Sequence, residues 1–211
     1  KESAKYLKIA NDESMKYKKS DLSLKIKHTE FYRSLKIKKS KNKYFKNSSK
    51  FVFIVGMPRS GSTLLENILS LNPDLTDMGE VNFLEESIKA TKDFEDIYDL
   101  YEKKVINQFQ SSIFYTDKNL FNYMYCAVIS NFFPKAKIIN CIRNPLDNIL
   151  SIYRANFLKQ SFSFSLMDIS SLYVHYFETM EEYKIKFRGN IYDYYYEDLI
   201  ENPNDVIPGI I

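Results

Sequence analysis

The chain has 211 residues, of which 45% are hydrophobic and 27% are charged, and its formal net charge is +3. This length and composition suit one globular α/β domain with an extra segment, and the small net charge argues against a nucleic-acid partner. There is no run of about 18 apolar residues, so no membrane span is predicted. The two cysteines and two histidines match no metal or redox spacing, which predicts a protein without a metal site.

The first fifty residues differ from the rest because lysines crowd into them. Apolar side chains recur at roughly helical spacing from residue 2 to about residue 38, which predicts helices there. Residues 38–50 are polar and basic and are predicted to form a linker. Because the chain starts at Lys1 without a methionine and stops at Ile211, we expect both ends to be truncations of a longer protein.

From residue 51 onward, apolar runs typical of buried strands alternate with segments of helical pattern. The predicted strands are 51–55, 114–116, 136–142 and 191–195, and the predicted helices are 63–71, 121–133, 145–157, 166–187 and one that opens at 203. Asn144 and Pro145 form a favourable helix start, as N-cap and first helical residue. The alternation predicts a parallel sheet covered by helices on both faces.

A glycine-rich loop, Gly56-Met57-Pro58-Arg59-Ser60-Gly61-Ser62-Thr63, follows the first predicted strand. A strand-to-helix turn with two glycines lets the backbone approach a ligand, and the helix behind it offers free N–H groups to an anion. The spacing resembles the phosphate loop G-x-x-x-x-G-K-[ST], but Ser62 replaces the lysine that reaches a nucleoside triphosphate. The loop therefore predicts an anion site in which Arg59 supplies the cation.

Three motifs in sequence order resemble the sulfotransferase family, which uses 3′-phosphoadenosine-5′-phosphosulfate (PAPS) and leaves 3′-phosphoadenosine-5′-phosphate (PAP). Residues 53–65, which contain the glycine-rich loop, resemble the family's 5′-phosphosulfate loop. Residues 138–145, with Ser151 eight positions after Arg143, resemble its 3′-phosphate motif. Residues 190–203 resemble the strand and turn that follow. The order of the motifs makes this likeness more specific than any one of them.

Two shorter motifs, Met78-Gly79-Glu80 and Thr116-Asp117-Lys118, resemble protein-tyrosine sulfotransferases and their bacterial relatives with N-terminal tetratricopeptide repeats. The resemblance implies a parallel sheet flanked by helices, the α/β fold of P-loop-containing nucleotide hydrolases, over residues 51–211. Residues 1–50 would then be a helical segment and a basic linker, the end of a helical repeat region. Tyrosine-type enzymes have a further C-terminal segment that closes over the nucleotide, and this chain stops before it.

The resemblance also assigns roles to individual residues. The implied cofactor-binding residues are Arg59, Ser60, Gly61, Ser62, Thr63, Arg143, Ser151 and Tyr196. Glu80 is the implied general base, and Lys118 would stabilise charge on the bridging oxygen. The sequence by itself leaves plainer roles open, since Glu80 would also suit the first turn of a helix and Lys118 a solvated loop.

These observations predict a PAPS-dependent sulfotransferase that acts on a hydroxyl acceptor, with no metal. Peptide tyrosine, a carbohydrate and a small molecule all remain open as the acceptor, and so does the oligomeric state. The alternatives are a degenerate P-loop nucleotide kinase, and a non-catalytic helical-repeat interaction protein with a relic nucleotide pocket. A bacterial source would place the protein in the cytoplasm.

Overall fold

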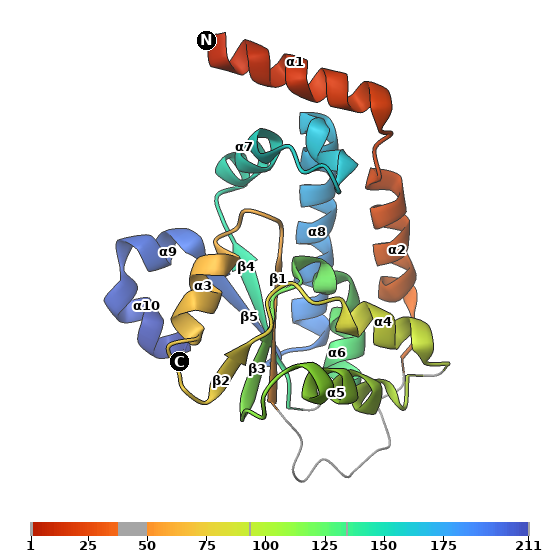
Figure 1. Cartoon of the computed structure of the whole chain (residues 1–211), viewed down its shortest axis with the longest axis vertical. Helices are drawn as coiled ribbons and strands as arrows, with labels where there is room; N and C mark the ends of the chain where they lie inside the picture. Colours follow the sequence, from red (N-terminus) through yellow and green to blue (C-terminus); the bar gives the residue numbers. More distant parts are fainter. Residues whose placement is uncertain (1, 38–49, 93, 134, 211) are drawn as a thin grey trace.

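The computed structural model in Figure 1 describes residues 2–37, 50–92, 94–133 and 135–210. Its centre is a parallel sheet with the strand order β2-β3-β1-β4-β5. The strands are β1 Lys50–Gly56, β2 Leu75–Asp77, β3 Phe114–Asp117, β4 Lys137–Ile142 and β5 Ile191–Tyr195. The predicted parallel sheet is therefore confirmed, and the strand that precedes the glycine-rich loop lies in its middle.

Helices cover both faces of this sheet. The helices of the described residues are α1 Glu2–Tyr17, α2 Leu22–Ser34, α3 Ser62–Leu69, α4 Phe83–Ala90, α5 Ile97–Gln108, α6 Cys126–Phe132, α7 Pro145–Ala155, α8 Leu166–Lys186, α9 Tyr196–Glu201 and α10 Pro203–Ile210, with the 3₁₀ segments η1 Leu120–Tyr125 and η2 Ser161–Phe164. In Figure 1, α3, α9 and α10 lie on one side of the sheet, and α5, α6 and α8 lie on the other.

The burial of β1 explains its continuous apolar sequence. Phe51 and Phe53 are 1% and 0% exposed and belong to the larger core, which also contains buried side chains of α5, α6 and α8. Ile54 points to the opposite face and packs with Leu65 of α3 and Leu199 of α9. A strand with helices on both faces has no solvated side. It therefore lacks the alternation of polar and apolar residues seen in strands that expose one face to solvent.

Most predicted elements are present, and the differences are local. The segment predicted as a helix over 121–133 begins as η1 and becomes α-helical only at Cys126. Strand β2 and helices α4, α5 and α9 were not predicted. Three residues are too few to show a period in β2, and the run of tyrosines before α9 has the composition of a strand. Of the predicted linker, residues 38–49 lie outside the described part of the chain.

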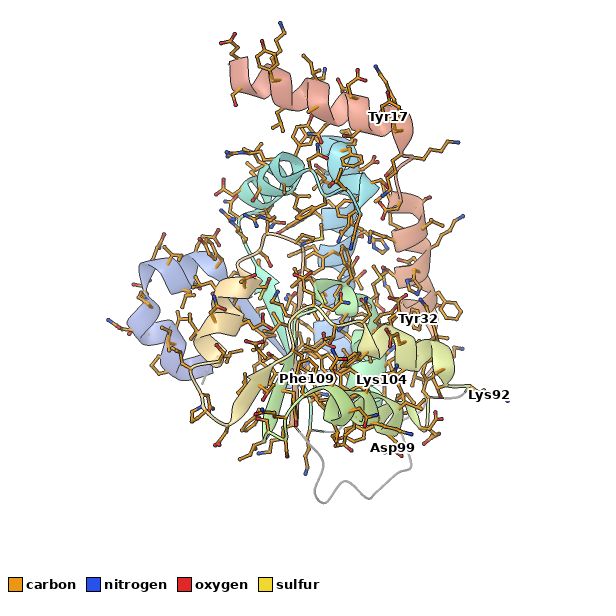
Figure 2. The ribbon with its side chains drawn as sticks, in the orientation of Figure 1. Tyr17, Tyr32, Lys92, Asp99, Lys104 and Phe109 are labelled. Carbon is orange, nitrogen blue, oxygen red and sulfur yellow. The ribbon has the colours of Figure 1, made fainter. Side chains whose placement is uncertain are left out.

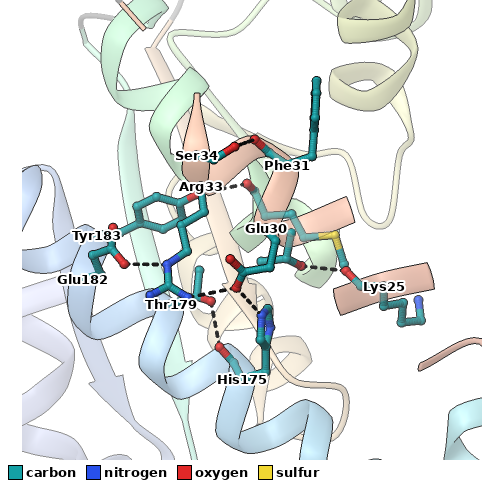
Figure 3. Close-up of polar contacts among 11 residues, drawn as sticks. Lys25, Glu30, Phe31, Arg33, Ser34, His175, Thr179, Glu182 and Tyr183 are labelled. Atoms are coloured by element: carbon teal, nitrogen blue, oxygen red, sulfur yellow. Dashed lines mark hydrogen bonds and ion pairs between the residues drawn. The ribbon is translucent and has the colours of Figure 1, made fainter. Parts of the chain in front are cut away.

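Helix α2 is fastened to α8 by a polar cluster, which Figure 3 shows. Glu30 accepts hydrogen bonds from His175 Nε2 at 2.7 Å and from Arg33 Nη1 at 2.9 Å. Arg33 Nε also donates to Glu182 on α8. In addition, Tyr32 packs into the larger core, whereas Tyr17 at the end of α1 is 88% exposed (Figure 2). Helix α2 is thus held against the sheet domain by both polar and apolar contacts.

Candidate functional site

The loop between β1 and α3 has a backbone that depends on its two glycines. Gly56 has a φ of +150° and Gly61 a φ of +91°. A Cβ on Gly56 would lie 2.7 Å from the carbonyl oxygen of Cys141, and one on Gly61 would lie 2.3 Å from Cδ2 of Tyr196. Arg59 between them also has a positive φ, +67°. The loop therefore turns sharply under the Tyr196 ring and leads into the N-terminus of α3, where backbone N–H groups are free to bind an anion.

The strand order places the predicted site residues side by side along the carboxyl edge of the sheet. Glu80 follows β2, Lys118 follows β3, the glycine-rich loop follows β1, Arg143 follows β4, and Tyr196 follows β5. Because all five strands are parallel, these segments share one edge of the sheet, where ligands bind in open α/β folds. Residues that are far apart in the sequence thus meet at one edge of the sheet.

Arg59 and Arg143 lie together on one side of the loop, in contact with each other, with Ser151 and with Tyr196. Arg143 Nη1 donates to the carbonyl oxygen of Arg59 at 3.1 Å, and its guanidinium carbon lies 4.8 Å from the centroid of the Tyr196 ring. Arg59 Nε donates to Ser151 Oγ at 3.3 Å. Four of the predicted cofactor-binding residues, from four different segments of the chain, therefore form one connected group.

Two residues that the sequence analysis missed hold this group in place. Asn148 on α7 is 1% exposed, and its Nδ2 donates to the carbonyl oxygen of Pro58 at 2.9 Å. Glu197 accepts a hydrogen bond from the backbone N–H of Asn144 at 2.9 Å. Asn144 is the predicted N-cap of α7, and its side chain accepts from the N–H groups of Leu146 and Asp147. A buried asparagine on an otherwise apolar helix face is the signal that would have identified Asn148.

Polar atoms beside the loop have unused hydrogen-bonding capacity. Ser60 Oγ and Arg143 Nε are both buried, and neither has a hydrogen-bond partner among the described residues. A buried polar group without a partner costs free energy, and such groups are uncommon in folded proteins. Together with the free N–H groups at the start of α3, these two atoms fit the binding of phosphate or sulfate oxygens.

On the other side of the loop, Lys118 and Glu80 form an ion pair. Lys118 Nζ lies 3.2 Å from Glu80 Oε1, and the side chains are 8% and 71% exposed, respectively. The backbone holds the two segments together, because Lys118 N donates to the carbonyl oxygen of Gly79 at 2.9 Å. Helix α4 begins at Phe83, three residues after Glu80, so Glu80 is not a first-turn acid of that helix. Lys118 is buried and is not a solvated loop lysine.

Next to this pair lies a fully buried carboxyl group, Asp117, which the sequence analysis did not single out. It accepts hydrogen bonds from Tyr101 OH at 2.9 Å, from the Asn119 N–H at 3.0 Å and from Asn122 Nδ2 at 3.0 Å. Burial raises the pKa of Asp117 to about 7, although these donors oppose the shift. Asp117 therefore anchors the loop that presents Lys118.

The site opens into a cleft of about 1280 Å³, and helix α2 forms part of its wall. Leu24, Lys25 and His28 line it together with Arg59, Glu80 and Arg143, among others. Lys25 Nζ lies 3.8 Å from the centroid of the Phe121 ring, and His28 Nε2 lies 3.4 Å from Tyr125 OH. Desolvation lowers the pKa of His28, so the imidazole is neutral at pH 7. Sequence patterns predicted α2 as a helix but carried no signal of this role.

Two kinds of feature do not occur in the described residues. The ranges 2–37, 50–92, 94–133 and 135–210 contain no group of three or more His, Cys, Asp or Glu side chains placed to hold a metal ion. Within the same ranges, every helix is too short or too polar to cross a membrane.

The fold and the glycine-rich loop together define an α/β protein of the phosphate-loop type, with Ser62 in place of the phosphate-loop lysine. The model of the sulfotransferase family matches residues 52–112 and 92–211, which is most of the chain. The chain therefore belongs to the sulfotransferase family.

The chain is also similar to a known protein and to solved structures. An uncharacterized protein of Aquifex aeolicus (strain VF5) is 28% identical over 189 residues, which are 76% of this chain. The chain spans about a quarter of the length of that relative. A sulfotransferase from Alicyclobacillus acidocaldarius has a similar structure, with a TM-score of 0.52 and 20% identity over 75% of this chain and 77% of its own. The sulfotransferase domain of the Synechococcus PCC 7002 olefin synthase gives a TM-score of 0.57 and 19% identity over 83% of this chain and 75% of its own. These structures share the fold.

Proposed function

We propose that this protein transfers a sulfuryl group from PAPS to a hydroxyl acceptor. The observation that carries the proposal is the convergence, at one edge of the sheet, of a glycine-rich loop, two arginines and a lysine–glutamate pair. Membership of the sulfotransferase family supports the reaction class. The donor, the acceptor and the residue roles below belong to the proposal.

The residues around the loop suit a nucleotide with phosphate at both ends of its ribose. The backbone N–H groups of residues 60–63, with the hydroxyls of Ser62 and Thr63, would bind the 5′-phosphate. The guanidinium group of Arg59 would offset charge on the phosphosulfate, and Arg143 with Ser151 would bind the 3′-phosphate. The Tyr196 ring packs against Gly61 and lies next to Arg143, so it would limit the position of the nucleotide.

The lysine–glutamate pair provides the remaining groups that the reaction needs. Bound PAPS supplies an activated sulfuryl group whose S–O bond to the phosphate breaks as a new S–O bond forms to the acceptor. Glu80 accepts the proton that the acceptor hydroxyl loses, and its exposure lets it rotate toward that hydroxyl. Lys118 presents an ammonium group that stabilises negative charge on the bridging oxygen of the leaving phosphate. Neither role requires a metal ion.

The acceptor would enter through the rest of the cleft, which is walled by α2, η1 and the segment 155–160. We propose a hydroxyl as its reactive group, and Glu80 would take the proton that the attacking oxygen loses. Peptide tyrosine, carbohydrate and small-molecule hydroxyls all satisfy this requirement.

A calorimetric titration with PAP tests the proposal directly. PAP is expected to bind with the same affinity in EDTA as in Mg²⁺, whereas ATP with Mg²⁺ should bind weakly. Arg143→Ala should weaken PAP binding by about 10- to 100-fold, the effect of losing a charge-assisted contact, and should change the binding of 5′-AMP little. Tight binding of ATP that requires Mg²⁺ would favour a kinase instead. Binding of neither nucleotide would favour an interaction protein.

A further inference from the structure

Helix α3 contains a buried carboxylate that the roles above leave unused. Glu66 lies one helical turn after Ser62, and its side chain is 7% exposed. Ionised side chains are almost never buried unless they are paired. An exposed position on α3 was available, since the adjacent Asn67 faces solvent. The burial of Glu66 therefore indicates that its partners matter.

These partners belong to the reaction side of the site. Glu66 Oε2 lies 3.6 Å from Lys118 Nζ, and Glu66 Oε1 accepts a hydrogen bond from Thr116 Oγ1 at 3.4 Å. The backbone of Gly79, the residue before Glu80, also hydrogen-bonds to this carboxylate. One buried group on α3 thus contacts strand β3, the lysine that follows β3, and the loop that carries Glu80.

The two carboxylates that face Lys118 differ in freedom. Glu80 is 71% exposed and lies on a loop, so its contact with the ammonium group can break without leaving a buried charge. Glu66 is enclosed and its backbone is helical, so it has few rotamers in which it stays paired. Glu66 therefore fixes the position of the ammonium group, while Glu80 remains able to turn toward an acceptor.

We propose that Glu66 is a positioning residue for sulfuryl transfer, which aims the Lys118 ammonium group at the reacting atoms and ties the Glu80 loop to the phosphate-binding helix. This inference rests on the proposed function for the identity of the reaction. The location of Glu66 on α3 supports it. This short helix begins at the glycine-rich loop, and its residue Glu66 contacts Lys118, so the helix connects the loop to the lysine. A shift in α3 would move the loop and the lysine together.

The electrostatics of the cluster agree with this role. Burial raises the pKa of Glu66, and the charge of Lys118 opposes that shift. Glu66 therefore relies on Lys118 to remain ionised, and Lys118 in turn has a negative partner that stays in place when Glu80 moves away. Two other acidic groups face Glu66: the charge of Asp77 disfavours ionisation of its carboxyl, and the buried Asp117 interacts with it as well.

The test compares Glu66→Gln with Asn67→Gln, an exposed change on the next residue of the same helix. Gln keeps the size of Glu66 and its ability to accept hydrogen bonds from Thr116 and Gly79 but removes the charge. We expect Glu66→Gln to lower kcat by about 10- to 100-fold per molecule that binds PAP, with the Kd for PAP within about twofold of wild type. Asn67→Gln should change neither quantity. A loss of PAP affinity with kcat unchanged would overturn the proposal.

A double-mutant cycle shows whether Glu66 acts through Lys118. If it does, adding Glu66→Gln to Lys118→Met should lower kcat by less than about twofold beyond Lys118→Met alone. Fully multiplicative losses would mean that Glu66 acts by another route, and the proposal would be wrong.

A measurement that needs no turnover separates this inference from the proposed function. Acetic anhydride at limiting concentration, followed by mass spectrometry, reports how readily the Lys118 amine reacts. Labelling of Lys118 should be at least threefold faster in Glu66→Gln than in wild type or Asn67→Gln, because the amine is no longer held against a carboxylate. Equal labelling rates would overturn the positioning role even in an active enzyme. Faster labelling of Lys118 in a protein that transfers no sulfuryl group would support the contact between Glu66 and Lys118 and contradict the proposed reaction.

Discussion

At the scale of single residues, the side chains of the site are distinguished by the contacts that the fold gives them. Glu80 is exposed on the loop after β2, yet it meets a buried lysine that follows β3. Arg143 stands at the end of β4, where its guanidinium group reaches both the glycine-rich loop and the Tyr196 ring. In each case the fold selects the residue by bringing it to the shared sheet edge.

Glu80→Gln should lower kcat for sulfuryl transfer by about 10²–10⁴-fold, the usual contribution of a positioned general base. The amide keeps the size and can still accept a hydrogen bond from Lys118, so PAP affinity should stay near that of wild type. Steady-state kinetics with radiolabelled PAPS and PAP calorimetry give the two quantities.

The matched control for this change is Glu86→Gln on helix α4, which follows the Glu80 loop. Glu86 is exposed and pairs with Lys104 on α5, outside the set of side chains that lines the cleft. It should leave turnover unchanged. Equal losses in the two variants would indicate a general electrostatic effect, and Glu80 would not be the base.

Gly61→Ala should weaken PAP binding at least tenfold, because the new methyl group would lie 2.3 Å from the Tyr196 ring and would push it away from the loop. Gly189→Ala is the control. Gly189 also has a positive φ, +84°, but has nothing within 4 Å of the new methyl group, so it carries only the backbone strain. Calorimetric Kd values and thermal unfolding of both variants separate strain from the clash. Equal PAP affinity in the two would show that the ring contact does not shape the site.

At the scale of elements, long and strongly patterned segments were predictable and the residues that organise the site were not. The apolar run 51–55 and the Asn144-Pro145 helix start were identified correctly, because local physics decides them. The predicted site residues also converge as the family resemblance implied. Glu66 and Asn148 escaped prediction, because their importance comes from contacts made across 50 and 90 positions of sequence.

Asp117, the last residue of β3, makes the free energy of unfolding depend on pH. Burial raises the pKa of Asp117 from 3.8 to about 7. Between these values the folded protein keeps a proton that the unfolded chain releases. The contribution of this group to the free energy of unfolding is therefore fully present below about pH 4 and is lost as the pH rises through about 7.

Asp117→Asn removes this titration and leaves a neutral group of similar shape. The wild-type protein should lose stability relative to Asp117→Asn between pH 5 and pH 8, whatever constant offset the substitution introduces. Urea unfolding of both proteins at the two pH values measures the difference. A difference that stays constant with pH would mean that Asp117 is ionised throughout.

At the scale of the whole molecule, the structure bears on how the N-terminal helices relate to the rest. The family match begins at residue 52, but α2 lines the cleft and is fastened to α8. Tyr32 on α2 lies 4.7 Å, between ring centroids, from Tyr125, which also lines the cleft. Part of the cleft wall therefore depends on residues outside the family match.

Truncation of one tyrosine on each N-terminal helix tests this dependence. Tyr32 is 8% exposed within the larger core, so Tyr32→Ala should lower the free energy of unfolding of the whole chain by about 2–5 kcal/mol, the range for large buried side chains. Tyr17 is 88% exposed, and Tyr17→Ala should change it by less than about 0.5 kcal/mol. Urea unfolding followed by far-UV circular dichroism, with and without PAP, gives both values. If α2 belongs to the same cooperative unit as the sheet, Tyr32→Ala shifts one single transition, and PAP shifts it back. An early separate transition, with the PAP-stabilised one unmoved, would show that residues 1–50 unfold as an independent segment.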